Sequence, residues 1–348
     1  MEKHKNLDLR SDTVTLPTHE MREAAAMAEV GDDVFGEDPT VNRLEKLAAE
    51  RLGKESGLFV TSGTQGNIVC VLSHTQRGDE IILESRSHIF TDEVGGLAAL
   101  GGLMARTVPG SLGWMRPEDI VAAIRYPNIH APHTSLVCLE NTHNQAGGVP
   151  LSVDQMKADW DVAKSHGLGV HLDGARIFNA AIALKVDVKQ ISQYADSVQF
   201  CLSKGLCAPV GSVVVGTRDF VEKARKYRKM LGGGMRQAGI IAAPGIVALT
   251  KMVDRLAEDH ENARLLAEGL ESIPGVRILN PVMTNMIRID VSGLGWTGKD
   301  WGDACAMLGW RGGGSARSTV IRLCTHYGIW KEDVEAFLEG IRRLTLKR

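Results

Sequence analysis

SVQFCLSKG, residues 197–205, begins with a mostly apolar run of strand length, 197–202, and a lysine, Lys204, stands just after that run. An apolar run without polar alternation is typical of a strand buried on both faces of a sheet. A lysine at the end of such a strand is partly removed from water, which favours its neutral amine and makes it a nucleophile able to form a Schiff base. Taken alone, a lysine in this setting is more often a solvated loop residue, so Lys204 needs support from other residues.

A carboxylate ends a second apolar run, GVHLDGAR at residues 169–176. Asp173 is expected at the carboxyl end of a buried strand, where ligands of open α/β sheets bind. An aspartate there can keep a pyridinium nitrogen protonated and so make the ring a better electron sink. Aspartate is also a favoured helix N-cap. Arg176 can serve as a structural ion-pair partner or as a binder of carboxylates.

The third feature is TSGTQGN, residues 61–67, between an expected strand and an expected helix. Small residues there let backbone N–H groups close on a phosphate, helped by the helix dipole. The lysine of a Walker loop is missing. A phosphate loop, an Asp-ended strand and a Lys-ended strand 31 residues further on occur in the order expected for a pyridoxal phosphate (PLP) site. We interpret the three together as such a site.

The rest of the chain alternates short apolar strands with helices, which predicts an α/β fold with a mostly parallel sheet covered on both faces. Its 348 residues indicate two domains. We expect an N-terminal segment at 1–16, a large PLP-binding domain at 17–260 and a small C-terminal α+β domain at 261–348. The expected strands are 57–60, 80–84, 136–139, 169–172, 197–202, 211–215, 276–279, 286–291 and 320–324.

Two helices carry specific expectations about their ends. Thr40 is a favoured N-cap residue and is expected to begin a helix that runs through Arg51. The triple glycine at 232–234 ends a basic helix, and Gln237 is expected to begin a long helix that continues towards Leu270.

Composition excludes several classes of protein. The formal net charge is −2 and the isoelectric point about 6.6, so no basic excess points to nucleic acid or to an anionic membrane. No run reaches the roughly 18 apolar residues of a membrane helix, and the N-terminus has no apolar signal region. None of the six cysteines forms a CxxC pair, which predicts buried, reduced thiols and a cytoplasmic location.

The sequence resembles the low-specificity L-threonine aldolases, PLP enzymes of the aspartate-aminotransferase fold (fold type I) within the beta-eliminating lyase/threonine aldolase superfamily. The resemblance extends from residue 8 to residue 326 and so covers nearly the whole chain. The matching strings are DLRSDTVT (8–15), GDDVFGEDPTVNRLE (31–45), SGTQGN (62–67), ENTHN (140–144), HLDGARIFNA (171–180), FCLSKGLCAPVGS (200–212), LGGGMRQAG (231–239) and IRLCTH (321–326).

The resemblance implies a role for each matching residue. Lys204 is similar to the lysine that links to the cofactor, and Asp173 to the partner of the pyridine nitrogen. His88 is similar to the imidazole that stacks on the cofactor ring, and His130, in a looser match, to a second active-site histidine. The remaining implied roles are phosphate and cofactor binding by Gly63, Thr64, Ser203 and Arg176, cofactor contact across a subunit boundary by Arg236, and substrate-carboxylate binding by Ser11, Arg176 and Arg322.

The activity implied by the resemblance is reversible cleavage of L-threonine, L-allo-threonine and other β-hydroxy-α-amino acids to glycine and an aldehyde. The base that removes the hydroxyl proton can be His88, His130 or an ordered water. Homodimers or homotetramers with active sites between subunits are also implied. The preferred substrate, the selectivity between threo and allo isomers and the choice between dimer and tetramer remain open.

Three alternatives remain. Other beta-eliminating lyases and serine-hydroxymethyl-type transferases share the fold and the lysine. A nucleotide-binding module is suggested by residues 293–299, GLGWTGK, but Asp300 stands where the loop would need Ser or Thr to bind Mg²⁺. A metal enzyme is suggested by His171 and Asp173 on one side of a strand, but no further ligands have suitable spacing, so no metal is expected.

Overall fold

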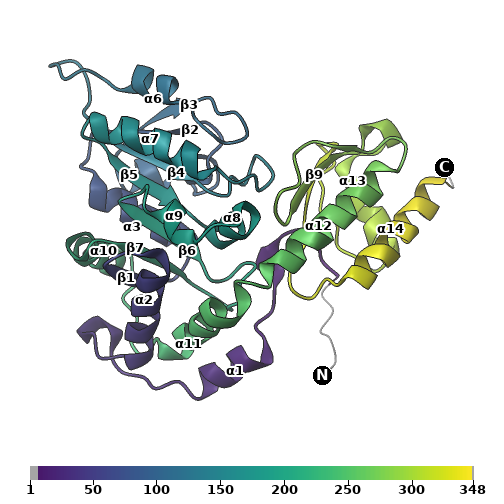
Figure 1. Ribbon diagram of the computed structural model, residues 1–348, viewed down its shortest axis with the longest axis horizontal. Coiled ribbons are helices and arrows are strands. Elements are labelled where there is room, and N and C mark those ends of the chain that lie inside the picture. The colour runs from purple at the N-terminus through teal and green to yellow at the C-terminus, as the bar shows by residue number, and fades with distance from the viewer. Residues whose placement is uncertain (1–6, 347–348) are drawn as a thin grey trace.

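The computed structural model describes residues 7–346 and contains a large and a small β-sheet (Figure 1). The strands of the large sheet are β1 (Ser56–Val60), β2 (Glu80–Glu84), β3 (Met104–Val108), β4 (Thr134–Glu140), β5 (Gly169–Asp173), β6 (Ser197–Cys201) and β7 (Ser212–Gly216). They lie in the order β1-β7-β6-β5-β4-β2-β3. Only β7 runs against its neighbours, so the predicted mostly parallel sheet is confirmed.

Helices cover both faces of this sheet, as predicted. Successive strand residues point to opposite faces, and Val213 and Val214 accordingly belong to different apolar clusters. The helices that share the cluster of Val213 are α2 (Pro39–Leu52), α6 (Pro117–Ala123), α7 (Val153–Ser165), α8 (Ile177–Leu184) and α9 (Val188–Ser192). The helices on the opposite face are α3 (Gly63–His74), α5 (Gly96–Ala99) and α10 (Arg218–Met230).

The small sheet is antiparallel and has an apolar core of its own. Its strands are β8 (Arg277–Ile278), β9 (Met286–Asp290) and β10 (Val320–Cys324), packed with α12 (Leu256–Glu271), α13 (Gly298–Met307) and α14 (Lys331–Leu346). The expected domain boundary at residue 260 lies within α12 and stays a prediction, as does the one at residue 16. Residues 1–6 and 347–348 of the expected end segments lie outside the described residues.

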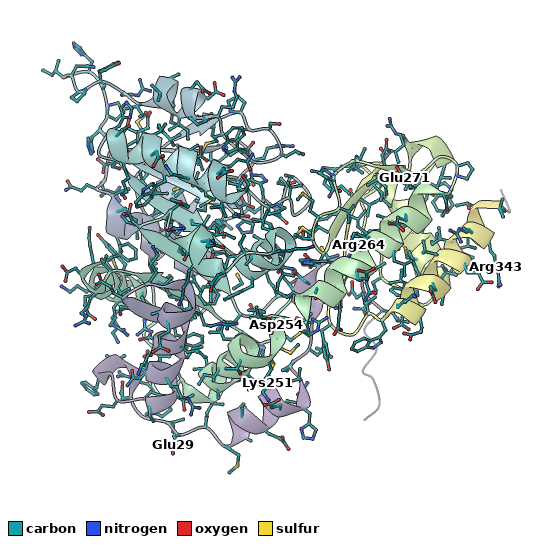
Figure 2. The ribbon with its side chains drawn as sticks, viewed as in Figure 1. Glu29, Lys251, Asp254, Arg264, Glu271 and Arg343 are labelled. Atoms are coloured by element: carbon teal, nitrogen blue, oxygen red, sulfur yellow. The ribbon has the colours of Figure 1, made fainter. Side chains whose placement is uncertain are left out.

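The joint between the two parts differs from the expected continuous helix. The chain forms α11 (Gly239–Val247) and a π-helical turn at Ala248–Met252 before α12 begins. Pro244 lies inside α11, where it removes one backbone donor, and π turns interrupt the regular ladder. Lys251 and Asp254 mark this joint in Figure 2, and the chain then continues along α12 past Arg264.

Helix caps bear on two further expectations, of which the first was wrong. Asp38, not Thr40, caps α2: its carboxylate accepts from Thr40 N (3.1 Å) and Val41 N (3.0 Å). The GLGWTGK stretch leads into α13, which is capped by Thr297. The Asp300 carboxylate accepts the Thr297 N–H (2.9 Å) and so completes a capping box. An acidic side chain thus occupies this helix N-terminus, which disfavours a phosphate there.

Two predictions from composition can be compared with the structure. All six cysteines are buried and unpaired, as predicted. Within residues 7–346, no helix combines the length and apolar character needed to cross a bilayer.

Candidate active site

Asp173 lies at the carboxyl end of β5 and is 2% exposed. It accepts hydrogen bonds from Asn67 Nδ2 (2.9 Å) and from Ala175 N (3.1 Å). With its amide oriented to satisfy both neighbours, Gln199 on β6 also donates to Asp173 Oδ1 (3.1 Å) while accepting from Phe200 N (3.2 Å). Three N–H donors therefore hold this carboxylate in place as an acceptor.

His88 begins the short helix α4 (His88–Thr91) and forms an ion pair with a carboxylate that sequence reasoning missed. Its Nδ1 lies 2.9 Å from Glu93 Oε1, and its backbone N–H donates to Glu140 Oε2 (2.7 Å). The hydrogen bond with Glu93 raises the pKa of His88, and burial raises the pKa of Glu93. An acid five residues after His88, just beyond a short helix, was the available signal.

The side chains of His88, Glu93 and Asp173 form a compact cluster, with ligand atoms within 4.8 Å of one another. Such atoms can also hold a divalent cation. However, both carboxylates already accept from the amide of Asn67, at 2.7 Å from Glu93 and 2.9 Å from Asp173, and Glu93 also pairs with His88. A flat ring with one N–H donor needs a single free acceptor, which this arrangement can offer at Asp173.

Lys204 follows β6 in a half-buried bend, next to the neighbouring strand end that carries Asp173. The Thr15 hydroxyl donates to its carbonyl oxygen (2.8 Å), which ties the bend to the N-terminal segment. Burial opposes ionisation of Asp12, but the charges of Arg176 and Lys204 hold the pKa of that carboxyl well below its usual range. The charge of Lys204 thus helps to keep Asp12 ionised.

Arg176 forms a buried bidentate ion pair with Asp12. Nε and Nη2 lie 2.7 and 2.6 Å from the two carboxylate oxygens, and Asn285 donates to Asp12 at 3.2 Å. Two of the three guanidinium nitrogens are thus used, and only Nη1 has no protein acceptor among residues 7–346. The structural role left open for Arg176 is present, and any substrate contact would use Nη1.

Arg322 on β10 has no such carboxylate. Nη1 donates to Asn144 Oδ1 (2.7 Å) and Nη2 to the Arg10 carbonyl (3.2 Å). In the described part of the chain no acidic side chain pairs with it, so its charge is available to a bound anion. Ser11 lies in the adjoining segment and caps a short 3-10 helix, accepting from Thr13 N (3.2 Å).

The expected phosphate loop is the first turn of α3. Ser62 is the N-cap and accepts from Gln65 N (3.2 Å), so Gly63 and Thr64 present backbone N–H groups at the positive end of a helix. A Cβ added to Gly63 would meet Cys201 Sγ at 2.9 Å, and one added to Gly66 would meet Gln199 Cγ at 2.4 Å. Glycine is therefore needed for α3 to approach β6. The same helix supplies Asn67, and Ser203 lies beside Lys204.

The residues around Asp173 and Lys204 fit PLP chemically. An amine, an acceptor for a ring N–H and a helix N-terminus for a phosphate come from β6, β5 and α3, which adjoin one another. The roles of the individual residues remain predictions, because no contact in the structure tests them.

Two expected site residues are not brought to this cluster within one chain. His130 is exposed in the loop after α6, where its backbone N–H donates to Asn128 Oδ1 (2.8 Å). This loop projects from the body of the molecule (Figure 1). Arg236 is 58% exposed and pairs with Asp32 (3.0 Å).

Comparison with known proteins places the chain in a family. Residues 8–293 match the beta-eliminating lyases. A probable low-specificity L-threonine aldolase 2 from Arabidopsis thaliana is 52% identical over 292 residues, covering 82% of each chain. The low specificity L-threonine aldolase of Escherichia coli K12 is 49% identical over 265 residues, 76% of this chain and 79% of the other.

Solved structures support the same fold. The chain matches a threonine aldolase from Leishmania major with a TM-score of 0.83 and 21% identity, covering 98% of this chain and 100% of the other. It matches a putative L-allo-threonine aldolase from Listeria monocytogenes with a TM-score of 0.79 and 19% identity, covering 98% and 97%. The expected aspartate-aminotransferase-like α/β fold is confirmed. This chain belongs to the beta-eliminating lyase family.

Proposed function

We propose that this protein is a PLP-dependent aldolase that cleaves L-threonine, L-allo-threonine and other β-hydroxy-α-amino acids, reversibly, to glycine and an aldehyde. The observation that carries the proposal is that Asp173 ends β5 and Lys204 follows the adjacent strand β6, beside the N-terminal turn of α3. The 52% and 49% identity to proteins named low-specificity L-threonine aldolases supports this choice among the reactions of the family.

The cofactor role falls to residues on or beside four elements, β5, β6, α3 and α4. PLP, when bound, supplies an aldehyde that links to an amine and a ring that accepts the electrons of the breaking Cα–Cβ bond. Lys204 provides the amine. Asp173 would accept the ring N–H and keep that proton in place, and His88 would lie against the ring. Gly63, Thr64 and Ser203 hold the phosphate with their N–H and hydroxyl groups.

Substrate binding requires a cation for the α-carboxylate. Arg322 is suited to this task because no acidic side chain among residues 7–346 pairs with its guanidinium group. The planar guanidinium group can also form two parallel hydrogen bonds with a carboxylate. Ser11 and the Nη1 group of Arg176 complete the carboxylate site. Holding the carboxylate fixes the orientation of the Cα–Cβ bond relative to the ring.

His88 is the preferred candidate for the base among His88, His130 and an ordered water. Glu93 holds Nδ1 of His88 (2.9 Å), which leaves Nε2 to accept the β-hydroxyl proton. The hydrogen bond with Glu93 raises the pKa of His88 and so stabilises the protonated imidazole that results. The same ring would then return the proton to the α-carbon of glycine.

A second copy of the chain is part of this proposal. Arg236 and His130 are exposed within one chain, and in a homodimer or homotetramer they can reach the site of a neighbouring subunit. Exposed apolar side chains are available for such contacts, including Phe35 (73%) and Val94 (98%). A cytoplasmic location and a role in threonine catabolism and glycine formation follow as further parts of the proposal.

The test combines a chemical label with product analysis. Borohydride reduction of the purified protein is expected to bleach the absorbance of the lysine–PLP linkage and to leave the label on the peptide that contains Lys204. Threonine is expected to yield acetaldehyde and glycine. Label on another lysine would contradict the site, and pyruvate with ammonia would indicate a beta-eliminating lyase instead. Lys223→Ala, on α10, is the control that should keep both results.

A further inference from the structure

Buried polar side chains form a hydrogen-bonded line that leads from His74 to Asp173. His74 Nε2 lies 2.8 Å from Ser197 Oγ, and the same oxygen lies 2.9 Å from His171 Nδ1. His171 Nε2 lies 3.1 Å from Asn67 Oδ1. Asn67 Nδ2 then donates to Asp173 (2.9 Å). Ser197, His171 and Asn67 are each at most 1% exposed.

Only one arrangement of protons satisfies this line. Asn67 Nδ2 donates to two carboxylates, Asp173 and Glu93, so Asn67 Oδ1 must be the acceptor for His171. His171 Nε2 therefore carries the hydrogen. Burial lowers the pKa of His171 to about 3, so the ring is neutral and Nδ1 has a free lone pair. The Ser197 hydroxyl donates to that lone pair, and its oxygen accepts from His74 Nε2.

The line lies in the buried interior of the large sheet, where His171 on β5 pairs with Cys138 on β4 and with Ser197 on β6. Buried polar groups in such surroundings are costly unless every one is hydrogen-bonded. Here every member has a partner. If His171 did not donate to it, the Oδ1 of Asn67 would be a buried acceptor without a partner, which costs free energy and favours a shift of the amide away from the carboxylates.

We propose that His171 is a positioning residue for the cofactor, acting through Asn67. Its Nε2–H tautomer holds the Asn67 amide with both N–H groups towards the carboxylates, so that Asp173 keeps a fixed acceptor towards the ring N–H of PLP. This inference rests on the proposed function for the identity of the cofactor. The tautomer and the orientation of the amide belong to the protein itself and can be tested separately.

The first test is the protonation of His171 in the full-length protein purified with PLP. Nitrogen-15 NMR of the imidazole rings is expected to show that His171 is a neutral Nε2–H ring that does not titrate between about pH 5 and 9. The signal is assigned by its loss in His171→Gln. A ring that is charged at pH 7, or that carries its proton on Nδ1, would overturn the proposal.

The second test compares two substitutions of similar size. Gln can place an N–H donor near the position of Nε2, whereas Leu cannot. His171→Leu is expected to weaken PLP binding about tenfold, the scale of losing one buried hydrogen bond in a charged network, and to lower kcat more than it changes KM. His171→Gln is expected to restore both values to within about threefold.

Controls separate this role from general destabilisation. His166→Leu, at an exposed position after α7, should leave PLP binding unchanged. Equal PLP affinity for folded His171→Leu and the unaltered protein would refute the positioning role. If His171→Leu does not fold, the positioning role is decided by the NMR result for His171 and by whether the PLP affinity of His171→Gln stays within about threefold of the unaltered protein. Failure of the proposed aldolase reaction would appear instead in the borohydride and product experiments.

Discussion

Arg176 and Asp12 lie 164 positions apart in the chain and form a bidentate ion pair with N···O distances of 2.7 and 2.6 Å. Asp12 is fully buried and Arg176 is 7% exposed. Since both charges are removed from water, each depends on the other for compensation. The pair joins the N-terminal segment to the residue that precedes α8.

Asp12→Asn should therefore be strongly destabilising. Removal of one partner of a buried pair typically costs about 3–5 kcal/mol because the other charge stays uncompensated. We expect a loss of this size in urea unfolding. Asp32→Asn, which breaks the exposed pair with Arg236, is the matched control and should change stability little. A loss for Asp12→Asn no larger than that of the control would contradict this account.

A second prediction concerns Asp159 on α7. Burial raises its pKa to about 8, against one opposing hydrogen bond from Trp114 Nε1 (3.2 Å). The unfolded chain releases this proton near pH 3.9, so between about pH 4 and 8 the folded state binds one proton more. Stability contributed by the protonated form is thus lost progressively as the pH rises through this window.

Asp159→Asn removes that pH dependence. Its urea midpoint should fall less between pH 5 and pH 8 than the midpoint of the unaltered protein. Asp161→Asn, an exposed position on the same helix, should follow the unaltered protein. Parallel curves for all three proteins would show that Asp159 is ionised in the folded state.

The His88–Glu93 pair predicts a shifted pH profile. Glu93→Gln removes the carboxylate that raises the pKa of His88, so neutral His88 should persist to lower pH. The acidic limb of kcat/KM is expected to move to lower pH, with a lower maximum. Glu118→Gln, on α6, should leave the profile unchanged. An unmoved acidic limb would mean that His88 is not the group that titrates.

Direct replacement separates the candidate bases. His88→Asn should lower kcat by about 10²–10⁴-fold, the scale of positioned acid–base catalysis, and weaken PLP binding as well because the ring contact is lost. His130→Asn should leave PLP affinity unchanged. A larger loss of kcat for His130→Asn than for His88→Asn would transfer the role of base to the exposed loop, supplied by another subunit.

Arg322→Lys tests the carboxylate site. Lysine keeps the charge but loses the planar fork, so KM for threonine should rise by about tenfold or more while PLP affinity stays the same. Arg317→Lys, in the exposed loop before β10, should leave KM unchanged. An unaltered KM for Arg322→Lys would remove Arg322 from the substrate site.

Much of the large sheet could be predicted from the sequence because its strands are short and apolar. The expected strand 80–84 has the observed bounds, and so does 320–324 in the small sheet. Strand β3 was missed because four of its five residues are exposed at the sheet edge, so no apolar run marks it. α13 was missed because its glycine-rich start resembles a loop.

The candidate site was predictable where a residue follows a buried strand, as Asp173 and Lys204 do. Asp12 was not recognised because only folding brings its partner near it. Glu93 was missed although it stands five residues after its partner His88, and its link to Asp173 forms only in the folded chain. The partner of Asp12 is Arg176, and Glu93 meets Asp173 through the amide of Asn67. Sequence spacing carries no record of such contacts between distant segments.

The path of the N-terminal segment has a practical consequence for engineering. Thr15 donates a hydrogen bond to the carbonyl oxygen of Lys204, and Asp12 forms an ion pair with Arg176. Neither Thr15 nor Asp12 belongs to a sheet. A shortened version starting at Pro17 would retain every strand of both sheets, yet its reactive centre would lack a counter-ion and an anchor. Affinity tags and fusion partners are therefore better attached after α14.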